Sequence, residues 1–403
     1  MFFFHPFQGS YIKLLYNKNI FFFFKILNKL LNIVFYFIFK FFNLKFLPIP
    51  LEAIGHQTFD LECFFYEYKK KKLNFKPIII DLKFYIANRY FFYNYQKKKN
   101  KFLIIKNWIL GICLLSQRRY KNITYNTYDY QETHKVGKVF TIFNKKPFKY
   151  KLKKSDEFLA KDIIKKYNIN IKKNFILMHV RDNNFKPFDG EDYRSCNVND
   201  FSFAVKWLKK KNFQIIRMGH YNMNKFSMNK EIIDLTTIKL LQEEREILEL
   251  YFVQNCYFFI GTASGPFCLA SVFDKPLVIF NTAPLSNVFP CARRGISVPK
   301  LYTDQNNKIL SFDEVINYNF TNYRMSIDYI KSNIKLRDAS KIEILETVKE
   351  LYSKVKNDDF TEKKLQKEFK KLFNRNLHHS ANSKSSISYA FIKKYKNLMP
   401  SNV

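Results

Sequence analysis

Short apolar runs alternate with amphipathic stretches along most of the chain, and this alternation predicts an α/β fold. The apolar runs are nearly continuous, as in parallel strands that are covered on both faces. Strands are therefore expected near residues 46–54, 76–82, 102–105, 174–180, 213–218, 231–235, 256–260 and 277–280. Helices are expected near residues 58–68, 155–167, 201–211, 240–253, 267–273, 340–356 and 361–373. Residues 120–150 and 380–388 show little periodicity, and we expect loops there.

The first segment of the chain, residues 20–47, is very apolar but carries polar residues at regular intervals. These polar positions are Lys25, Lys29, Asn32, Tyr36, Lys40 and Asn43. Steps of three or four residues place them on one face of a helix. The longest uncharged stretch, residues 30–39, is too short to span a bilayer. The pattern is typical of a helix that lies in the membrane interface, where anionic headgroups attract lysines. A helix packed on the protein's own core and a short tilted span are the alternatives.

Composition adds a large positive charge. The 403 residues include 69 basic and 34 acidic side chains, which gives a formal net charge of +35. This charge favours an anionic partner such as nucleic acid, phospholipid headgroups or a phosphorylated substrate. It equally fits a codon bias, because Phe, Tyr, Lys, Asn and Ile all have A/T-rich codons. The six cysteines form no Cys-x-x-Cys pair, which disfavours zinc or a disulfide framework and favours a reducing, cytoplasmic setting.

The sharpest break in the pattern is the turn Gly261-Thr262-Ala263-Ser264-Gly265, which follows a predicted strand. Small residues leave backbone N–H groups accessible, Pro266 begins a predicted helix, and the hydroxyls of Thr262 and Ser264 add donors. Together these groups suit phosphate oxygens. The turn is neither a Walker motif nor Gly-x-Gly-x-x-Gly. The alternative is a tight strand-to-helix turn that binds nothing.

Arg181-Asp182 follows another predicted strand. Ligands of open α/β sheets bind outside the carboxyl ends of the strands, and a guanidinium offers a fork of donors to phosphate. We therefore favour a ligand contact for Arg181. In the alternative, Arg181 pairs with Asp182 and orders the loop.

Two further positions are candidates for a general base. Asp192 belongs to the acidic cluster at residues 189–194. A carboxylate that lies near an acceptor hydroxyl can take the proton of that hydroxyl. The alternative is a solvated loop whose carboxylates pair with Arg194. Gly55-His56 lies where a predicted strand turns into a helix. A glycine there lets the backbone approach a ligand closely, although a turn or capping role for His56 is the plainer alternative.

The combined motifs resemble a family of bacterial glycosyltransferases of cell-surface polysaccharide biosynthesis. The resemblance covers residues 47–312 and rests on the order and spacing of Ile54-Gly55-His56, Asn88, His179-Val180-Arg181-Asp182, Asp192-Tyr193-Arg194, Ile216-Arg217-Met218-Gly219, Ile233-Asp234, the run at 259–265, and Pro299-Lys300 ahead of Ser311-Phe312. It implies the GT-B class, in which two Rossmann-like lobes face a cleft. The run at 179–181 and the turn at 262–265 are also similar, more distantly, to motifs of GDP-fucose-using transferases.

This resemblance implies roles for individual residues. Arg181 would neutralise the diphosphate of a sugar nucleotide, and Gly55 and His56 would face the acceptor. The implied catalytic residues are His56, Arg181 and Asp192. The implied ligand-binding residues are Gly55, Arg217, Asp234, Thr262, Ser264 and Gly265. GT-B enzymes generally need no bound metal or other cofactor, so cationic side chains stabilise the departing diphosphate.

The expected architecture has five parts: a membrane-interfacial segment (1–45), a Rossmann-like acceptor lobe (46–170), a Rossmann-like sugar-nucleotide lobe (171–325), terminal helices (326–375) and a basic tail (376–403). The expected function is metal-independent transfer of a sugar from a nucleotide-diphosphate sugar to a membrane-associated glycan or lipid-linked acceptor, on the inner face of the cell membrane and without a specific nucleic acid. The alternative is a non-catalytic basic protein that binds nucleic acid or anionic membrane.

Overall fold

The computed structural model describes residues 18–82, 86–97, 102–117, 120–125, 138–145, 148–171, 174–184, 190–221, 223–318, 320–374 and 378–400, with the backbone alone at 18–25 and 94–97. The chain divides into two compact units, Met1–Tyr130 (unit 1) and Gln131–Val403 (unit 2). Both units contain parallel sheets connected by helices, so the predicted α/β class is confirmed.

Unit 1 is built on a three-stranded parallel sheet of order β1-β2-β3. Helices connect the strands, because parallel neighbours need a crossover. Its elements are α2 (Lys18–Phe41), β1 (Leu44–Phe46), α3 (Ile54–Lys70), β2 (Lys76–Ile80), α4 (Arg89–Lys97), β3 (Leu103–Ile105) and α5 (Trp108–Ser116). The strand expected at 46–54 ends at residue 46 instead. Pro48 and Pro50 lie just beyond it, and a proline has no N–H to donate to a sheet.

Helix α2 packs on unit 1 through one face. Phe35 and Phe39 are buried in a cluster with Ile78 of β2 and Leu114 of α5. The packing alternative for this helix therefore holds for that face, while most other side chains at 26–41 are exposed or partly exposed. Among the described helices, none combines the length and apolarity that crossing a membrane requires.

Unit 2 is built on a seven-stranded parallel sheet of order β12-β9-β8-β7-β4-β5-β6. The chain starts in β4, builds β5 and β6 on one side, and returns to place β7, β8 and β9 on the other. This is the Rossmann strand order 3-2-1-4-5-6, with β12 added at one edge. The strands are β4 (Phe175–His179), β5 (Gln214–Arg217), β6 (Ile233–Asp234), β7 (Phe259–Thr262), β8 (Leu277–Thr282), β9 (Gly295–Pro299) and β12 (Ser386–Ile387).

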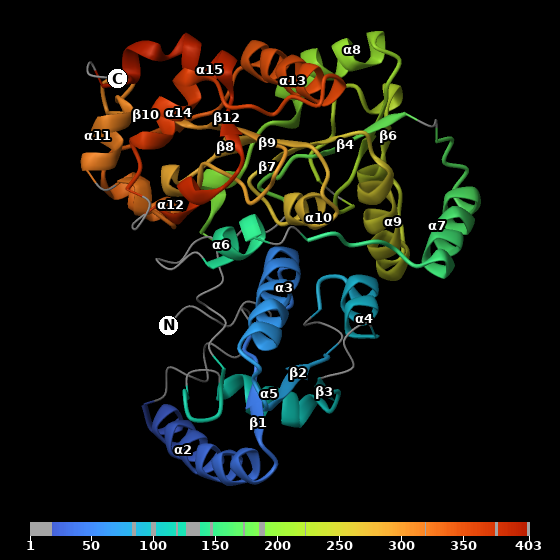
Figure 1. The fold of residues 1–403 in the computed structure, drawn as a ribbon, viewed down its shortest axis with the longest axis vertical. Helices are drawn as coiled ribbons and strands as arrows, with labels where there is room; N and C mark the ends of the chain where they lie inside the picture. The colour runs from blue at the N-terminus through green and yellow to red at the C-terminus, as the bar shows by residue number, and fades with distance from the viewer. Residues whose placement is uncertain are drawn as a thin grey trace. The chain divides into compact units, whose positions relative to one another are not determined.

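Helices cover both faces of this sheet. Figure 1 shows α8 (Ser202–Lys210) and α13 (Lys341–Lys356) on one face, and α9 (Gln242–Asn255) and α10 (Pro266–Val272) on the other. Unit 2 therefore has three layers, with the sheet between two layers of helices. The strand order of this sheet reverses between β4 and β7. The remaining helices and strands of unit 2 are α6 (Lys138–Lys145), α7 (Lys154–Lys166), β10 (Leu301–Thr303), α11 (Phe312–Asn317), α12 (Ser326–Lys331), β11 (Lys335–Arg337), α14 (Lys364–Lys371) and α15 (Tyr389–Lys394).

The division between the units falls at residue 130, earlier than the boundary expected at 170. Helix α7 belongs to unit 2 because Lys166 Nζ and Tyr167 OH donate to the Glu244 carboxylate of α9, at 2.6 and 2.7 Å. Helix α6 forms inside the 120–150 segment, where loops were expected. Its buried side chains include Phe140 and Phe143. Residues 126–137 of that segment lie outside the described part of the chain.

The C-terminal segment expected as a loose, basic tail is part of the fold in its described residues, 378–400. Strand β12 pairs with β9, and α15 buries Phe391 and Ile392. The serine-rich stretch is buried because its polar groups have partners: Ser385 Oγ donates to the Pro290 carbonyl over 2.7 Å, and Lys370 Nζ donates to two serine carbonyls. The expectation of a loose loop at 380–388 is therefore wrong.

Candidate functional site

The carboxyl ends of β4 and β7 are adjacent at the point where the strand order reverses. This switch point is where open α/β sheets bind their ligands. The backbone N–H of Arg181, two residues beyond β4, donates to Thr262 Oγ1 at the end of β7 over 2.9 Å. The structure thus brings together the Arg181 motif and the small-residue turn that the sequence indicated separately.

Gly261 explains why the two strands approach so closely. A Cβ atom at this position would lie 2.5 Å from the Phe259 ring and 3.2 Å from the His179 carbonyl oxygen. Any larger residue would push β4 and β7 apart or displace that ring. The glycine therefore serves the packing of the switch point, and no ligand is needed to account for it.

The hydroxyls of the turn bond within the protein. Thr262 Oγ1 accepts from the Arg181 backbone, and Ser264 Oγ lies 3.0 Å from His179 Nδ1. Both hydroxyl residues are buried. Burial, reinforced by His220 and by the cations Arg217 and Arg181, lowers the pKa of His179 to about 3. His179 is therefore neutral at physiological pH, and this hydrogen bond is one between uncharged groups. Gly265 begins α10 with an ordinary right-handed helical conformation.

Arginine side chains gather beside this turn. Arg194 donates from Nε and Nη2 to the Ala263 carbonyl, over 3.0 and 2.8 Å, and pairs with Glu191. The side chain of Arg181 is only 6% exposed, and its Nη1 lies 4.0 Å from the Glu191 carboxylate. Two guanidinium groups thus share one partly exposed carboxylate at the edge of β4 and β7. Both guanidinium groups therefore lie beside the turn that follows β7, and a guanidinium fork is a good donor to phosphate oxygens.

A third arginine, Arg324, joins them from the loop before α12. Its Nη2 donates to Ser286 Oγ over 3.3 Å. Burial, with a contribution from the charge of Arg194, lowers its pKa. The arginines at 181, 194 and 324 all act on the pKa of Tyr193, which burial raises. We name the cluster of Arg181, Arg194 and Arg324 the arginine cluster.

Sequence reasoning missed Arg324. It lies far along the chain from Arg181 and follows no predicted strand. Backbone contacts bring it to the site: the Ser326 N–H donates to the Gly190 carbonyl over 2.7 Å, and Ser326 Oγ accepts from the Tyr193 N–H over 3.2 Å. The pairing is tertiary, and no local signal in the sequence marks it.

Arg217 and Asp234, which the sequence implied as ligand-binding residues, pair with each other. They form an ion pair with 3.0 Å between Nη1 and Oδ2, and their side chains are 0% and 1% exposed. Arg217 also donates to the Asn224 carbonyl over 2.9 Å. The pair joins the ends of β5 and β6.

Asp182 has a similar structural role. Its carboxylate accepts from the backbone N–H groups of Asn184 and Asn224, over 3.1 and 2.6 Å, and is buried. It ties the loop after β4 to the loop after β5. These contacts order the loop through backbone amides, and Arg181 lies instead toward Glu191.

The two candidate bases belong to different units, Asp192 to unit 2 and His56 to unit 1. Asp192 is exposed, in a short 3₁₀ helix (Asp192–Arg194), and Asp189 of the same acidic cluster lies outside the described residues. Gly55 and His56 belong to unit 1, in the first turn of α3 rather than in a turn before it. His56 Nδ1 lies 3.2 Å from Asp60 Oδ2, one helical turn along.

Comparisons with known proteins give a partial match. No known protein family matches the chain, and no curated protein matches it. Among solved structures, the dodecameric iron-containing heptosyltransferase TibC in complex with ADP-D-beta-D-heptose aligns at 19% identity and a TM-score of 0.23. The alignment covers 31% of this chain and 32% of that one. The likeness to this glycosyltransferase is weak and spans about a third of its length, so the functional argument must stand on the site itself.

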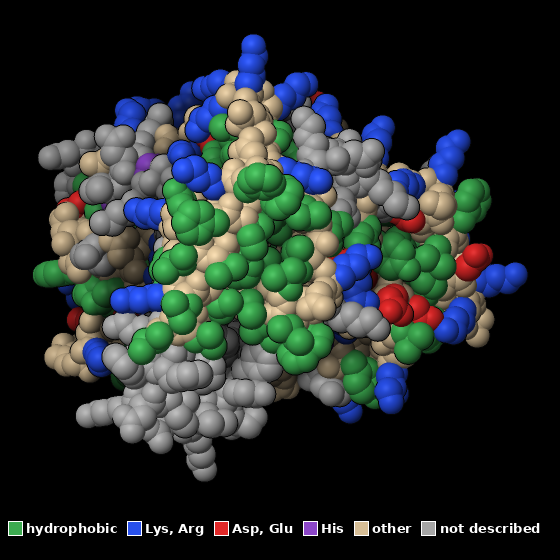
Figure 2. Space-filling model, turned by 90° about the horizontal axis from the view of Figure 1, so that it is seen from below, with side chains coloured by type: hydrophobic (Ala, Val, Ile, Leu, Met, Phe, Trp, Pro, Cys, Tyr) green, Lys and Arg blue, Asp and Glu red, His purple; other side chains and the backbone are tan. Residues whose placement is uncertain are grey.

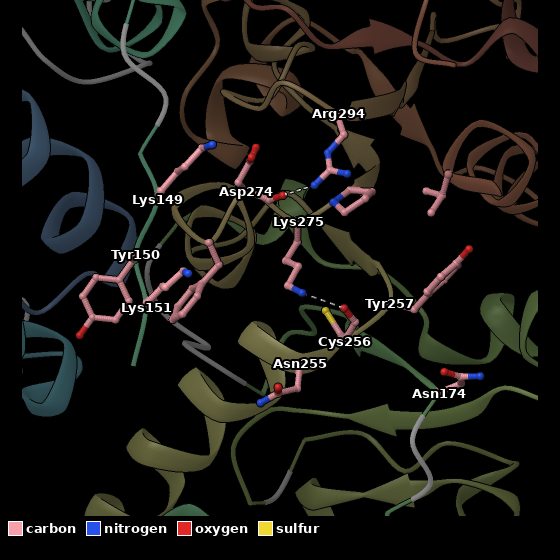
Figure 3. A pocket seen from close by; sticks show the side chains of 13 residues that line it. Lys149, Tyr150, Lys151, Asn174, Asn255, Cys256, Tyr257, Asp274, Lys275 and Arg294 are labelled. Atoms are coloured by element: carbon pink, nitrogen blue, oxygen red, sulfur yellow. Dashed lines mark hydrogen bonds between the residues drawn. The ribbon is translucent and has the colours of Figure 1, made fainter. Parts of the chain in front are cut away.

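A separate hollow of about 500 Å³ lies at the opposite, amino-terminal edge of the same sheet (Figure 3). Asn174, Cys256 and Pro276 line it, each close before β4, β7 or β8. Its cations are partly engaged: Lys275 Nζ donates to the Cys256 carbonyl over 3.1 Å, and Arg294 donates to the Asp274 carbonyl, as the dashed lines in Figure 3 mark. Because parallel sheets bind ligands at their carboxyl edge, we place the site at the arginine cluster.

Across the described residues, no group of three or more His, Cys, Asp or Glu side chains is arranged to hold a metal ion. The cations described at the site are guanidinium groups. Arginine suits phosphate binding because its planar fork matches two phosphate oxygens at once.

Proposed function

We propose that unit 2 binds a nucleotide-diphosphate sugar at the switch point between β4 and β7, and that the protein transfers the sugar to an acceptor. The observation that carries this proposal is the arginine cluster at the carboxyl edge of a sheet with the Rossmann strand order. A diphosphate carries two negative charges, and the planar fork of a guanidinium group suits two of its oxygens at once. Negative charge develops on the diphosphate as it leaves the sugar, and cations placed beside it stabilise that charge.

In this proposal the three arginines have distinct tasks. Arg181, with its backbone fixed to Thr262, holds a constant position and would contact the diphosphate first. Arg194 and Arg324 would stabilise the charge that develops when the sugar leaves. The hydroxyls of Thr262 and Ser264 act through the position of the strand ends, since both already bond within the protein.

Further parts of the proposal concern the acceptor. Unit 1, with its strand-helix-strand pattern, would be the acceptor lobe of a GT-B enzyme, and His56 or Asp192 would take the acceptor proton. The His56–Asp60 contact supports the first choice, because a carboxylate beside one ring nitrogen orients the imidazole of a general base. The acceptor would be a glycan or a lipid-linked saccharide, and turnover would need no added metal.

The test is release of nucleoside diphosphate from GDP-, UDP- and ADP-sugars, and of CMP from a CMP-sugar, with chelator present. Arg181→Ala should lower turnover by about 10²-fold or more, as loss of a transition-state donor does. Arg181→Lys should retain part of it. Wild-type turnover in Arg181→Ala would overturn the role of Arg181. Strong, salt-sensitive RNA binding with no response to any sugar nucleotide would favour the non-catalytic alternative.

A further inference from the structure

The outward face of α2 is apolar over the residues whose side chains are described, 26–41. Phe37 and Phe41 are 64% and 82% exposed, although soluble proteins rarely leave such side chains in contiguous patches. Figure 2 shows hydrophobic side chains gathered in the middle of this face of unit 1, with Lys and Arg side chains toward its margins. The exposed apolar residues of α2 are Ile26, Leu27, Leu30, Ile33, Val34, Phe37, Ile38, Phe41 and Phe42, the last just after the helix.

Helix α5, which the sequence analysis did not predict, adds to this surface. Its first turn exposes Trp108, Ile109 and Leu110. Its far end is fastened to α2, because the Gln117 side-chain amide donates to the Asn28 carbonyl over 3.2 Å. We call the exposed apolar residues of α2 and α5 together the α2–α5 face.

We propose that the α2–α5 face docks unit 1 on the surface of an anionic lipid bilayer. This inference goes beyond sugar transfer and does not depend on it. The two helices would lie in the headgroup region with their apolar side chains directed toward the acyl chains, as amphipathic interfacial helices do.

Charge identifies the partner. The exposed lysines Lys29 and Lys40 lie on one flank of α2, and Lys106 lies just before α5. The sequence has no Asp or Glu in residues 1–51 or 101–128, so no acidic side chain from these stretches opposes an anionic surface. Trp108, 62% exposed, is the residue type that prefers the boundary between headgroups and acyl chains.

Helix α2 also packs on the core of unit 1, so unit 1 would dock on the bilayer surface without α2 crossing it. Phe35 and Phe39 are buried in the core of unit 1, so α2 cannot be surrounded by lipid without leaving that core. A second copy of the chain fits the face less well than lipid does, because two such faces would bring lysines together without acidic partners.

The test is co-sedimentation of the full chain with vesicles of phosphatidylcholine alone and with vesicles that also contain phosphatidylglycerol. Binding is expected to the anionic vesicles and to fall with added salt. The double variant Phe37→Asp/Phe41→Asp should lower the bound fraction at least about tenfold, since charged residues are costly in the interface. Lys29→Glu/Lys40→Glu should lower it by a similar factor, since each lysine contributes to attraction.

Matched controls alter equally exposed residues elsewhere. Phe158→Asp/Ile342→Asp changes side chains of unit 2 that are 65% and 61% exposed, and should bind as the wild type does. Equal binding by the Phe37→Asp/Phe41→Asp variant, or equal binding to both vesicle types, would overturn the proposal. A wild type that forms a dimer and does not bind vesicles, with a Phe37→Asp/Phe41→Asp variant that is monomeric, would also overturn it. The α2–α5 face would then be an interface between copies. Absence of vesicle binding by the wild type would overturn the proposal in any case.

Discussion

The backbone N–H of Arg181 donates to Thr262 Oγ1 over 2.9 Å, which joins the chain just beyond β4 to the end of β7. This single bond crosses the switch point of the seven-stranded sheet. It fixes the backbone of Arg181, so that the guanidinium starts from a defined place beside Arg194 and Glu191. Thr262 is therefore a positioning residue for the arginine cluster.

Replacing Thr262 by valine keeps the shape of the side chain but leaves the Arg181 N–H without its acceptor. A buried donor without a partner costs about 1–3 kcal/mol, and the free energy of unfolding of unit 2 should fall by this amount. Thr141→Val is the control, because Thr141 is exposed on α6. Unfolding in urea is followed through Trp207 of unit 2 in a Trp108→Phe background, which leaves one reporter tryptophan. An unchanged unfolding free energy in Thr262→Val would show that the bond has no such role.

The buried pair of Arg217 and Asp234 should be structural. Arg217→Met leaves the Asp234 carboxylate buried without its cation, which costs about 3–5 kcal/mol. Arg217→Met/Asp234→Leu should lose less than the two single changes added together, because neither charge is then stranded. A stable Arg217→Met protein that no longer binds sugar nucleotides would return Arg217 to the ligand-binding role that the sequence implied.

The stability of unit 2 should fall with acid through His179. Its pKa is lowered to about 3 in the folded protein, against an ordinary value near 6.5, so between these pH values the unfolded chain binds the extra proton. The contribution of His179 is complete above about pH 6.5 and is lost as pH falls toward about 3, with a slope of up to about 1.4 kcal/mol per pH unit. His179→Gln should flatten the dependence by this one proton. If the free energy of unfolding depends on pH in the same way in the wild type and in His179→Gln, this role of His179 is contradicted.

Glu343 should anchor the C-terminal segment. It lies in the first turn of α13 and accepts from Lys394 Nζ over 2.8 Å and from Tyr395 OH, both in the segment that follows β12. Burial raises its pKa, but these hydrogen bonds and those from Ser340 prevail and lower it to about 2. Glu343→Gln should cost about 1–3 kcal/mol at neutral pH, an effect that fades as pH falls from about 4.5 to about 2. Glu346→Gln, half-exposed on the same helix, should cost little.

The sequence indicated the elements with strong apolar runs, and these were enough to locate the switch point. The strands β4 and β7, Arg181 and the turn at 261–265 all follow from local pattern. Strand β12 has no apolar run, so the sequence did not predict it. The serines around β12 are buried because they bond to residues far along the chain, and no local pattern shows such partners.

The predicted site residues also differ in how far local sequence determines their surroundings. The position of Arg181 at a strand end is a local property, whereas the burial of Arg217 depends on how β5 and β6 pair. Arg324 reaches the cluster only through the loop contacts of α12. A sequence pattern shows which residues follow strands, but the tertiary partners decide which of them keep charge for a ligand.

A thermal-shift screen of the full chain with GDP-, UDP-, CMP- and ADP-sugars tests whether the arginine cluster binds a sugar nucleotide. A ligand that binds only the folded protein raises its melting temperature, by an amount that grows with ligand concentration. We expect at least one sugar nucleotide to raise the melting temperature of the wild type, and the increase to be largely absent in Arg181→Ala and in Arg324→Ala. No response to any sugar nucleotide, or an equal response in both variants, would contradict a diphosphate site at the arginine cluster.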